Sequence, residues 1–72
     1  MRTVEQIAQL FENMGYVIDY VVGHTIEIVK YEGTDWTERE LDTLYDEASR
    51  YDSVRVSQIY SDPTVAQIEV GV

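Results

Sequence analysis

The side chains in this sequence that could do chemistry are mainly carboxylates. Fourteen Asp and Glu residues occur in a chain of 72, together with one histidine and no cysteine. Two carboxylates can serve as general acid and general base, but one of them then needs a raised pKa in a dry cleft. Most of these acids fall on the exposed flank of a short predicted helix, and a chain of this length has little room for a pocket. We therefore expect no catalytic residue and no enzyme.

Metal and cofactor sites are not indicated either. His24 is the only imidazole and is predicted to lie in a hairpin turn, so without cysteine or a second histidine it cannot anchor a metal or nucleophilic site. The spacing of the glycines forms no phosphate-binding loop, and the calcium-loop pattern is missing. These glycines are Gly15, Gly23, Gly33 and Gly71. We expect no metal and no cofactor.

A row of acids in the second half of the chain gives the sharpest functional hypothesis. Glu38, Asp42 and Asp46 recur at i, i+4 and i+8, which places neighbouring side chains roughly 5–6 Å apart on one flank of a helix. Glu40 and Glu47 fall on the other flank. Such a row can imitate a nucleic-acid backbone and occupy the basic groove of a nuclease or DNA-binding protein.

The first hypothesis is therefore a non-enzymatic protein-binding module, an inhibitor that occludes a basic surface of its partner. Small phage-encoded inhibitors of bacterial defence, anti-CRISPR proteins among them, are similar in size and charge, which is a likeness of class. Against this interpretation, Arg39 and Arg50 interrupt the acidic face, and Asp46 and Arg50 have the spacing of a favourable pair. A solvated helix explains the same pattern.

Further partner-binding residues are expected on the uncovered face of a sheet. We expect the acidic row to be extended by Asp35 and by Glu27 and Glu69, with Tyr31 beside them. This face is part apolar and part acidic, because Val29 and Val65 point away from the predicted core together with Glu27 and Glu69. Gln67 points the same way. It suits a partner or a homodimer mate, but it is also what exposed strands carry by propensity. In the first hairpin, either alternating set of residues could be the buried one.

The net charge limits the class of partner. Fourteen acids against five basic residues give a formal charge of −9, which repels phosphate backbones and anionic lipid, so direct nucleic-acid or membrane binding is not expected. The alternative function is a small housekeeping or structural protein of a salt-adapted organism, which dimerises through its open sheet face. The first residues form no signal peptide and no run reaches the length of a membrane span. We expect a cytoplasmic protein, in the host cytoplasm if it is viral.

Two helices must position these residues. Thr3 and Gln6 form a capping box before a helix over residues 4–14, and Gly15 follows it at the C′ position. Thr37 and Glu40 form a second capping box, and the helix that follows should fade near residues 50–52. Its predicted buried stripe consists of Leu41, Leu44, Tyr45 and Ala48, closed by Tyr51, with Trp36 and Leu41 as a hydrophobic staple.

Each helix is followed by two β-branched and aromatic runs. Strands are predicted over residues 16–22 and 25–32, joined by a turn at Gly23 and His24, and over 53–60 and 64–72, joined by a turn over 61–64. Thr3, Ile7, Leu10, Phe11 and Met14 superpose on Thr37, Leu41, Leu44, Tyr45 and Ala48 at one constant offset. The prediction is a single α+β domain over residues 1–72, an αββαββ two-layer sandwich with a four-stranded sheet and two helices on one face, resembling a circularly permuted ferredoxin-like fold.

Overall fold

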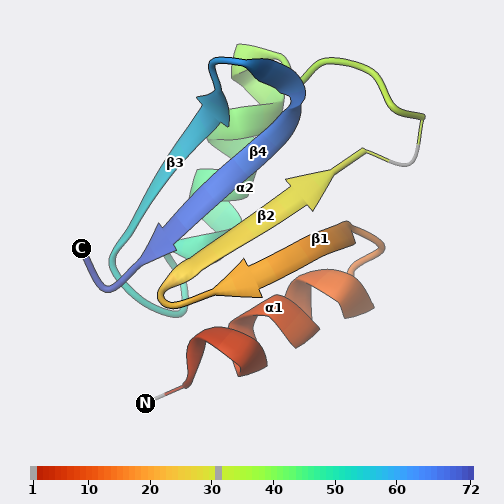
Figure 1. Ribbon diagram of the computed structural model, residues 1–72. Coiled ribbons are helices and arrows are strands. Elements are labelled where there is room, and N and C mark those ends of the chain that lie inside the picture. Colours follow the sequence, from red (N-terminus) through yellow and green to blue (C-terminus); the bar gives the residue numbers. More distant parts are fainter. Residues whose placement is uncertain (1, 31) are drawn as a thin grey trace.

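Two helices and a four-stranded antiparallel sheet form the molecule, as predicted (Figure 1). The computed structural model describes residues 2–30 and 32–72. The elements in chain order are α1 (Val4–Asn13), β1 (Val17–Val22), β2 (Thr25–Val29), α2 (Glu38–Ala48), β3 (Val54–Ile59) and β4 (Asp62–Val70). The α+β class and the αββαββ order are therefore confirmed.

Both helices begin at the predicted capping boxes. The Thr3 N–H donates to Gln6 Oε1 at 2.9 Å, and the Gln6 N–H donates back to Thr3 Oγ1 at 3.1 Å. At the start of α2, the Thr37 N–H and Glu40 Oε1 lie 2.9 Å apart, and the Glu40 N–H donates to Thr37 Oγ1 at 3.3 Å. Each box pairs backbone donors that the first helical turn would otherwise leave unsatisfied. Local residue spacing is thus sufficient to mark both starts.

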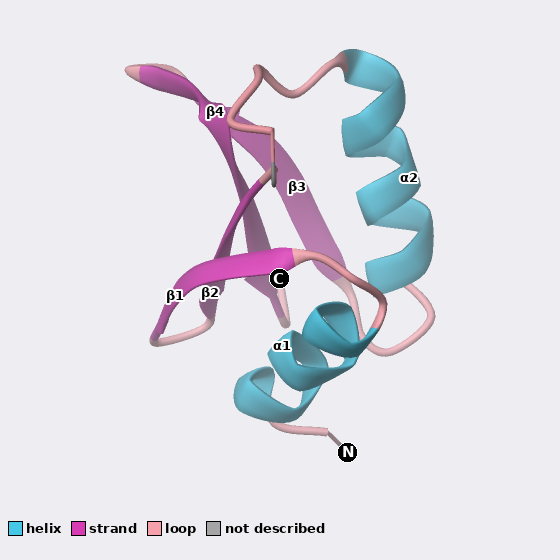
Figure 2. Ribbon diagram, turned by 90° about the vertical axis from the view of Figure 1, so that its right-hand side faces the viewer, coloured by secondary structure: helices cyan, strands magenta, loops and turns pink. Residues whose placement is uncertain are grey.

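The sheet has strand order β1-β2-β4-β3, and every neighbouring pair is antiparallel. Both helices lie on the same side of it, so one face is covered and the other is open (Figure 2). The covered face and the helices share one core, whose largest fully buried side chains are Ile7, Phe11, Ile26, Ile28, Leu44 and Ile68. The strands alternate about this core, since Ile26 and Ile28 are buried while Glu27 between them is only partly buried.

The first strand contains a bulge that decides which of its residues are buried. Ile18 lies opposite Ile28 and Val21 lies opposite Ile26, while the register shifts between them at Asp19. The extra residue changes the phase of the alternation, so two apolar side chains three positions apart both reach the core. Neither of the two alternating sets considered for this hairpin is buried as a whole. The side chains left on the open face are Val17, Tyr20 and Val22.

The buried stripe of α2 differs from the prediction at Tyr45. Leu44 and Ala48 are fully buried, but Tyr45 is 48% exposed, whereas its counterpart Phe11 in the constant-offset pattern is 0% exposed. The two helices therefore turn different sides of the shared pattern toward the sheet. The prediction was wrong at this position because a large residue at helical spacing can border a stripe without lying in it.

The second hairpin turns earlier than predicted, at Tyr60 and Ser61, and β4 begins at Asp62. Asp62 Oδ1 accepts hydrogen bonds from the Thr64 N–H at 3.2 Å and from the Thr64 hydroxyl at 2.6 Å. The Asp-Pro-Thr signal therefore marks a local side-chain turn inside an irregular strand start instead of the hairpin turn itself. The first hairpin turns at Gly23 and His24 as predicted, with Gly23 at φ 58°.

Candidate functional site

The acids that were predicted to form a row do so on the outer side of α2. Glu38, Asp42 and Asp46 are all exposed, at successive i, i+4 spacings on one flank of this helix. Among residues 2–30 and 32–72 the only ion pair joins Lys30 to Glu40, so the spacing of Asp46 and Arg50 does not produce one. We call Glu38, Asp42 and Asp46 the acidic row.

Tyr45 borders the acidic row. It follows Asp42 by three residues, a spacing at which side chains are neighbours on a helix surface, and its side chain is 48% exposed. Sequence reasoning missed it as a surface residue because it assigned this side chain to the core. One signal in the sequence could have predicted that Tyr45 is exposed. Leu44 and Ala48 already form a buried stripe, and the side of the helix that carries Asp42 and Asp46 lies outside that stripe.

The other two acids of α2 are used within the fold. Glu40 Oε1 accepts a hydrogen bond from Lys30 Nζ at 2.7 Å, and this contact, with the two hydrogen bonds from Thr37, lowers the pKa of Glu40 to about 2. Glu47 Oε1 accepts a long hydrogen bond of 3.4 Å from the Tyr16 hydroxyl. Burial, followed by the charge of Glu47, raises the pKa of Tyr16. The two flanks of α2 therefore have different roles, one structural and one solvent-exposed.

The expected extension of the acidic row onto the sheet does not occur. Glu27 and Glu69 lie on the open face, as expected, but this face points away from both helices, and the acidic row lies beyond the opposite face (Figure 2). Asp35 is exposed in the loop before α2. Tyr31 lies outside the described residues. The structure thus divides the predicted partner-binding residues between two separate surfaces.

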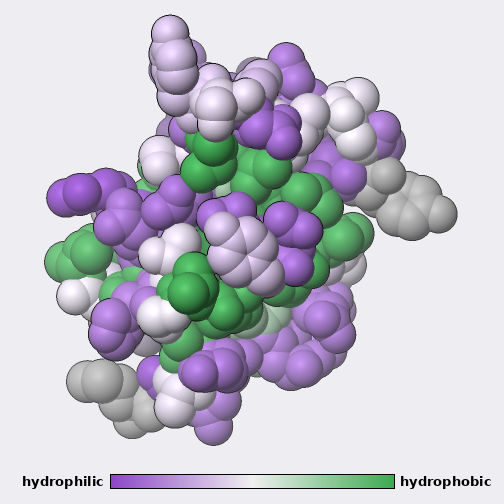
Figure 3. Space-filling model, in the orientation of Figure 1, coloured by the Kyte–Doolittle hydropathy of each residue, from purple (hydrophilic) through white to green (hydrophobic). Residues whose placement is uncertain are grey.

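The open face is partly apolar. Figure 3 looks onto it and shows hydrophobic residues gathered across the sheet, with hydrophilic residues among them. Val17 is 38% exposed and Val22 is 57% exposed, both on β1. The Tyr20 hydroxyl donates to Glu27 Oε2 at 2.7 Å, and this hydrogen bond raises the pKa of Tyr20. No helix covers these side chains, so this face is the second candidate surface.

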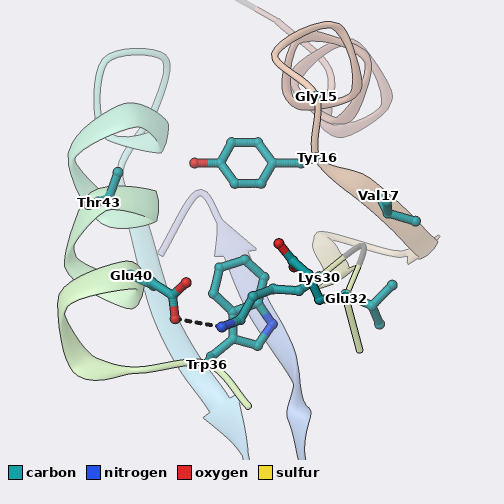
Figure 4. Close-up of a pocket in the computed structure, with 9 residues that line it drawn as sticks. Gly15, Tyr16, Val17, Lys30, Glu32, Trp36, Glu40 and Thr43 are labelled. Carbon is teal, nitrogen blue, oxygen red and sulfur yellow. Dashed lines mark hydrogen bonds and ion pairs between the residues drawn. The ribbon is translucent and has the colours of Figure 1, made fainter. Parts of the chain in front are cut away.

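A cavity of about 280 Å³ lies between the end of α1 and the start of α2, although the length of the chain argued against a pocket. Figure 4 shows Tyr16, Lys30, Trp36 and Glu40 around it. The rings of Tyr16 and Trp36 are 6.5 Å apart, and Lys30 Nζ lies 5.6 Å from the Trp36 ring centroid. Glu40 is held in its ionised form by a lowered pKa, which is the opposite of what a general acid requires. Glu40 is therefore used in an ion pair at this cavity and is not poised to donate a proton.

Trp36 serves the fold through both its ring and its backbone. The side chain is 5% exposed and belongs to the core. The backbone N–H of Trp36 donates to the Pro63 carbonyl at 2.9 Å, and the Gln58 side-chain amide donates to the carbonyls of Trp36 and Pro63 at 2.8 and 2.9 Å. These contacts hold the loop before α2 against the base of the second hairpin. Gln58 carried no sequence signal, because its partners are distant in the chain.

Within the parts of the chain that the structure describes, no three His, Cys, Asp or Glu side chains come together in a way that could hold a metal ion. His24 lies exposed in the first hairpin turn. Neither described helix has the length and apolar character needed to cross a membrane.

Comparisons with protein-family models, with curated proteins and with solved structures found no match to this chain.

Proposed function

We propose that this protein is a non-enzymatic binding module whose acidic row and Tyr45 engage a basic surface of a protein partner and block that surface for nucleic acid. The observation that carries the proposal is an exposed tyrosine beside three carboxylates that form no ion pair with any residue in the described ranges 2–30 and 32–72. Tyrosine is enriched at binding hot spots, and a row of carboxylates steers a cationic surface toward it. Partner and nucleic acid would then compete for the same site.

The test is a competition experiment with a panel of DNA-binding nucleases and fluorescent duplex DNA as the probe. We expect this protein to displace the DNA from at least one nuclease, with a binding affinity that falls as salt rises. Tyr45→Ala should weaken displacement by about tenfold or more. Neutralising the acidic row with Glu38→Gln, Asp42→Asn and Asp46→Asn should weaken it by about tenfold.

A matched control separates a local effect from the effect of total charge. Glu5→Gln, Glu12→Gln and Glu32→Gln remove the same charge from three exposed positions outside the acidic row. The control protein should displace DNA nearly as well as the unmodified protein. Equal losses in the two triple variants, or displacement that Tyr45→Ala leaves unchanged, would contradict the proposal.

A second candidate function treats the acidity as adaptation to salt. It is favoured by the absence of ion pairs at the acidic row among the described residues, because such charges repel one another at low ionic strength. Under this proposal the free energy of unfolding should rise steeply between low and molar salt, and the panel of nucleases should bind nothing. Unfolding that is indifferent to salt would rule it out.

A further inference from the structure

The open face is laid out in three rows that cross the sheet. The apolar row joins Val17, Val29 and Val65, of which Val65 is only 8% exposed. Beyond a register shift, Ile59 on the outer strand continues this row and lies opposite Asp62. The middle row joins Tyr20, Glu27, Gln67 and Ser57. The polar row joins Val22, Thr25, Glu69 and Arg55. The rows differ in chemistry, so any second surface must meet them in a defined order.

The charge of the open face is small for this protein. Its rows hold three carboxylates, Glu27, Asp62 and Glu69, and one guanidinium, Arg55, for a net charge of −2, whereas the whole chain carries −9. Arg55 and Glu69 are also direct cross-strand neighbours. A strongly basic partner would therefore find little complementary charge here. A partly apolar face that carries so small a share of the charge of an acidic protein is better suited to another surface of the same kind.

We propose that the open face is a dimer interface, and that its occupant is a second copy of this chain packed face to face about a two-fold axis parallel to the strands. In such a dimer the same patch serves both subunits, so every contact occurs twice. The axis brings β2 over β4 of the second copy and keeps each row against its own counterpart. The proposal is independent of the proposed function, since the acidic row lies on the opposite side of the molecule.

This symmetry places the carboxylates against hydrogen-bond donors. Glu27 comes opposite the partner's Gln67, and its Oε1 is free to accept from that amide because Oε2 already accepts from Tyr20. Glu69 comes opposite the hydroxyl of the partner's Thr25. No carboxylate lies directly over another. A buried carboxylate that accepts a hydrogen bond is far less costly than an unpaired one.

The same symmetry sets the apolar row against itself. Val29 comes over the partner's Val65, and Val17 comes over the partner's Ile59. A two-fold axis across the strands would instead place the polar row, with Glu69, over these valines and leave its carboxylate without a donor. The layout of the rows therefore selects one of the two symmetric packings.

The size of the open face predicts a weak dimer. Four strands and about five residues along each give a face of about 19 Å by about 17 Å. Packed at the usual sheet separation of about 10 Å, two such faces give roughly 650 Å² of contact area in total, below the standard size of specific interfaces and in the range of weak, transient ones. We expect a monomer–dimer equilibrium with a dissociation constant in the roughly micromolar to millimolar range. Two chains of like charge repel, so salt should strengthen the dimer.

Sedimentation velocity of the intact protein tests this, from about 10 µM to about 1 mM and from about 0.05 M to about 1 M NaCl. The dimer fraction should rise with concentration and with salt, whereas binding of a basic partner weakens with salt. On dilution, changes in amide chemical shift should concentrate on the three rows and spare the acidic row. A protein that stays monomeric at the highest concentration and salt, or shift changes centred on α2, would overturn the proposal.

A charge exchange identifies the predicted contact. Gln67→Glu puts a carboxylate opposite the partner's Glu27 and should raise the dissociation constant at least tenfold. Combining it with Glu27→Gln restores one donor against one acceptor and should recover most of that loss. Gln9→Glu adds the same charge on the exposed side of α1 and should have little effect. Equal weakening by Gln67→Glu and Gln9→Glu, or no recovery in the double variant, would overturn it. Urea unfolding of dilute protein checks that each variant folds.

Discussion

The outer side of α2 and the open face of the sheet are both solvent-exposed, yet they differ in chemistry. The first presents Glu38, Asp42 and Asp46 beside Tyr45, without an ion pair to any other described residue. The second presents an apolar row beside three carboxylates and one guanidinium. The negative charge of this chain is therefore not spread evenly. Because salt screens one kind of contact and relieves the repulsion that opposes the other, it should act on the two surfaces in opposite directions.

The largest expected effect comes from comparing the two faces of one strand. Ile28→Ala empties a fully buried site beneath the helices and should cost about 2–5 kcal/mol of unfolding free energy, a large part of the stability of so small a domain. Val29→Ala removes a partly buried side chain from the open face and should cost roughly 1 kcal/mol or less. Urea unfolding of dilute protein measures both. Similar losses for the two variants would mean that the open face is already covered in the monomer.

The next effect concerns the structural flank of α2. The pKa of Glu40 lies at about 2 in the fold, against an ordinary value of 4.5, so its ionised form stabilises the protein above pH 4.5. This contribution is lost as the pH falls from about 4.5 to about 2. Glu40→Gln should therefore flatten the acid side of a stability profile measured by urea unfolding. Glu38→Gln, in the acidic row, should leave that side unchanged, and a profile that Glu40→Gln does not alter would contradict the assignment.

A smaller effect is expected from removing the bulge in β1. Deleting Asp19 leaves Ile18 opposite Ile28 and Tyr20 opposite Glu27 in regular alternation, so the same side chains keep the same faces. We expect a folded protein whose stability changes by about 1 kcal/mol or less. If the strand instead kept an unbroken alternation through Asp19, the deletion would turn its second half over and unfold the hairpin. Circular dichroism and urea unfolding distinguish these outcomes.

The smallest expected effect is at Tyr20 on the open face. Its hydrogen bond to Glu27 raises the pKa of the phenol above 10.0, so this tyrosine should ionise later than a free one. Glu27→Gln should lower its pKa toward the ordinary value, as measured by ultraviolet titration against a Tyr20→Phe reference. Because the pKa of Tyr20 is raised above 10.0 in the fold, its hydrogen bond contributes to stability below pH 10, and this contribution is lost as the pH rises above 10. A titration that Glu27→Gln leaves unchanged would show that the contact is not made in solution.

The sequence predicted local features well, but it predicted less well which side of each helix or strand is buried. The capping boxes at Thr3 and Thr37 were confirmed because a cap depends on residues three positions apart. The side of Tyr45 was predicted wrongly, because helical spacing alone does not say where a stripe ends. The acidic row was visible in the sequence, but its separation from Glu27 and Glu69 was not. That separation depends on which face of the sheet the helices cover.

The order of elements, the starts of both helices and the turn at Gly23 were determined by the sequence itself, since each arises from contacts between near neighbours. The tertiary structure decided which side chains of each helix and strand face the core. In β1 this was settled by the bulge at Asp19, which exists only because β2 supplies the register against which one residue is extra. The surfaces available to a partner were decided in the same way, because burial is a property of packed elements and not of any one segment.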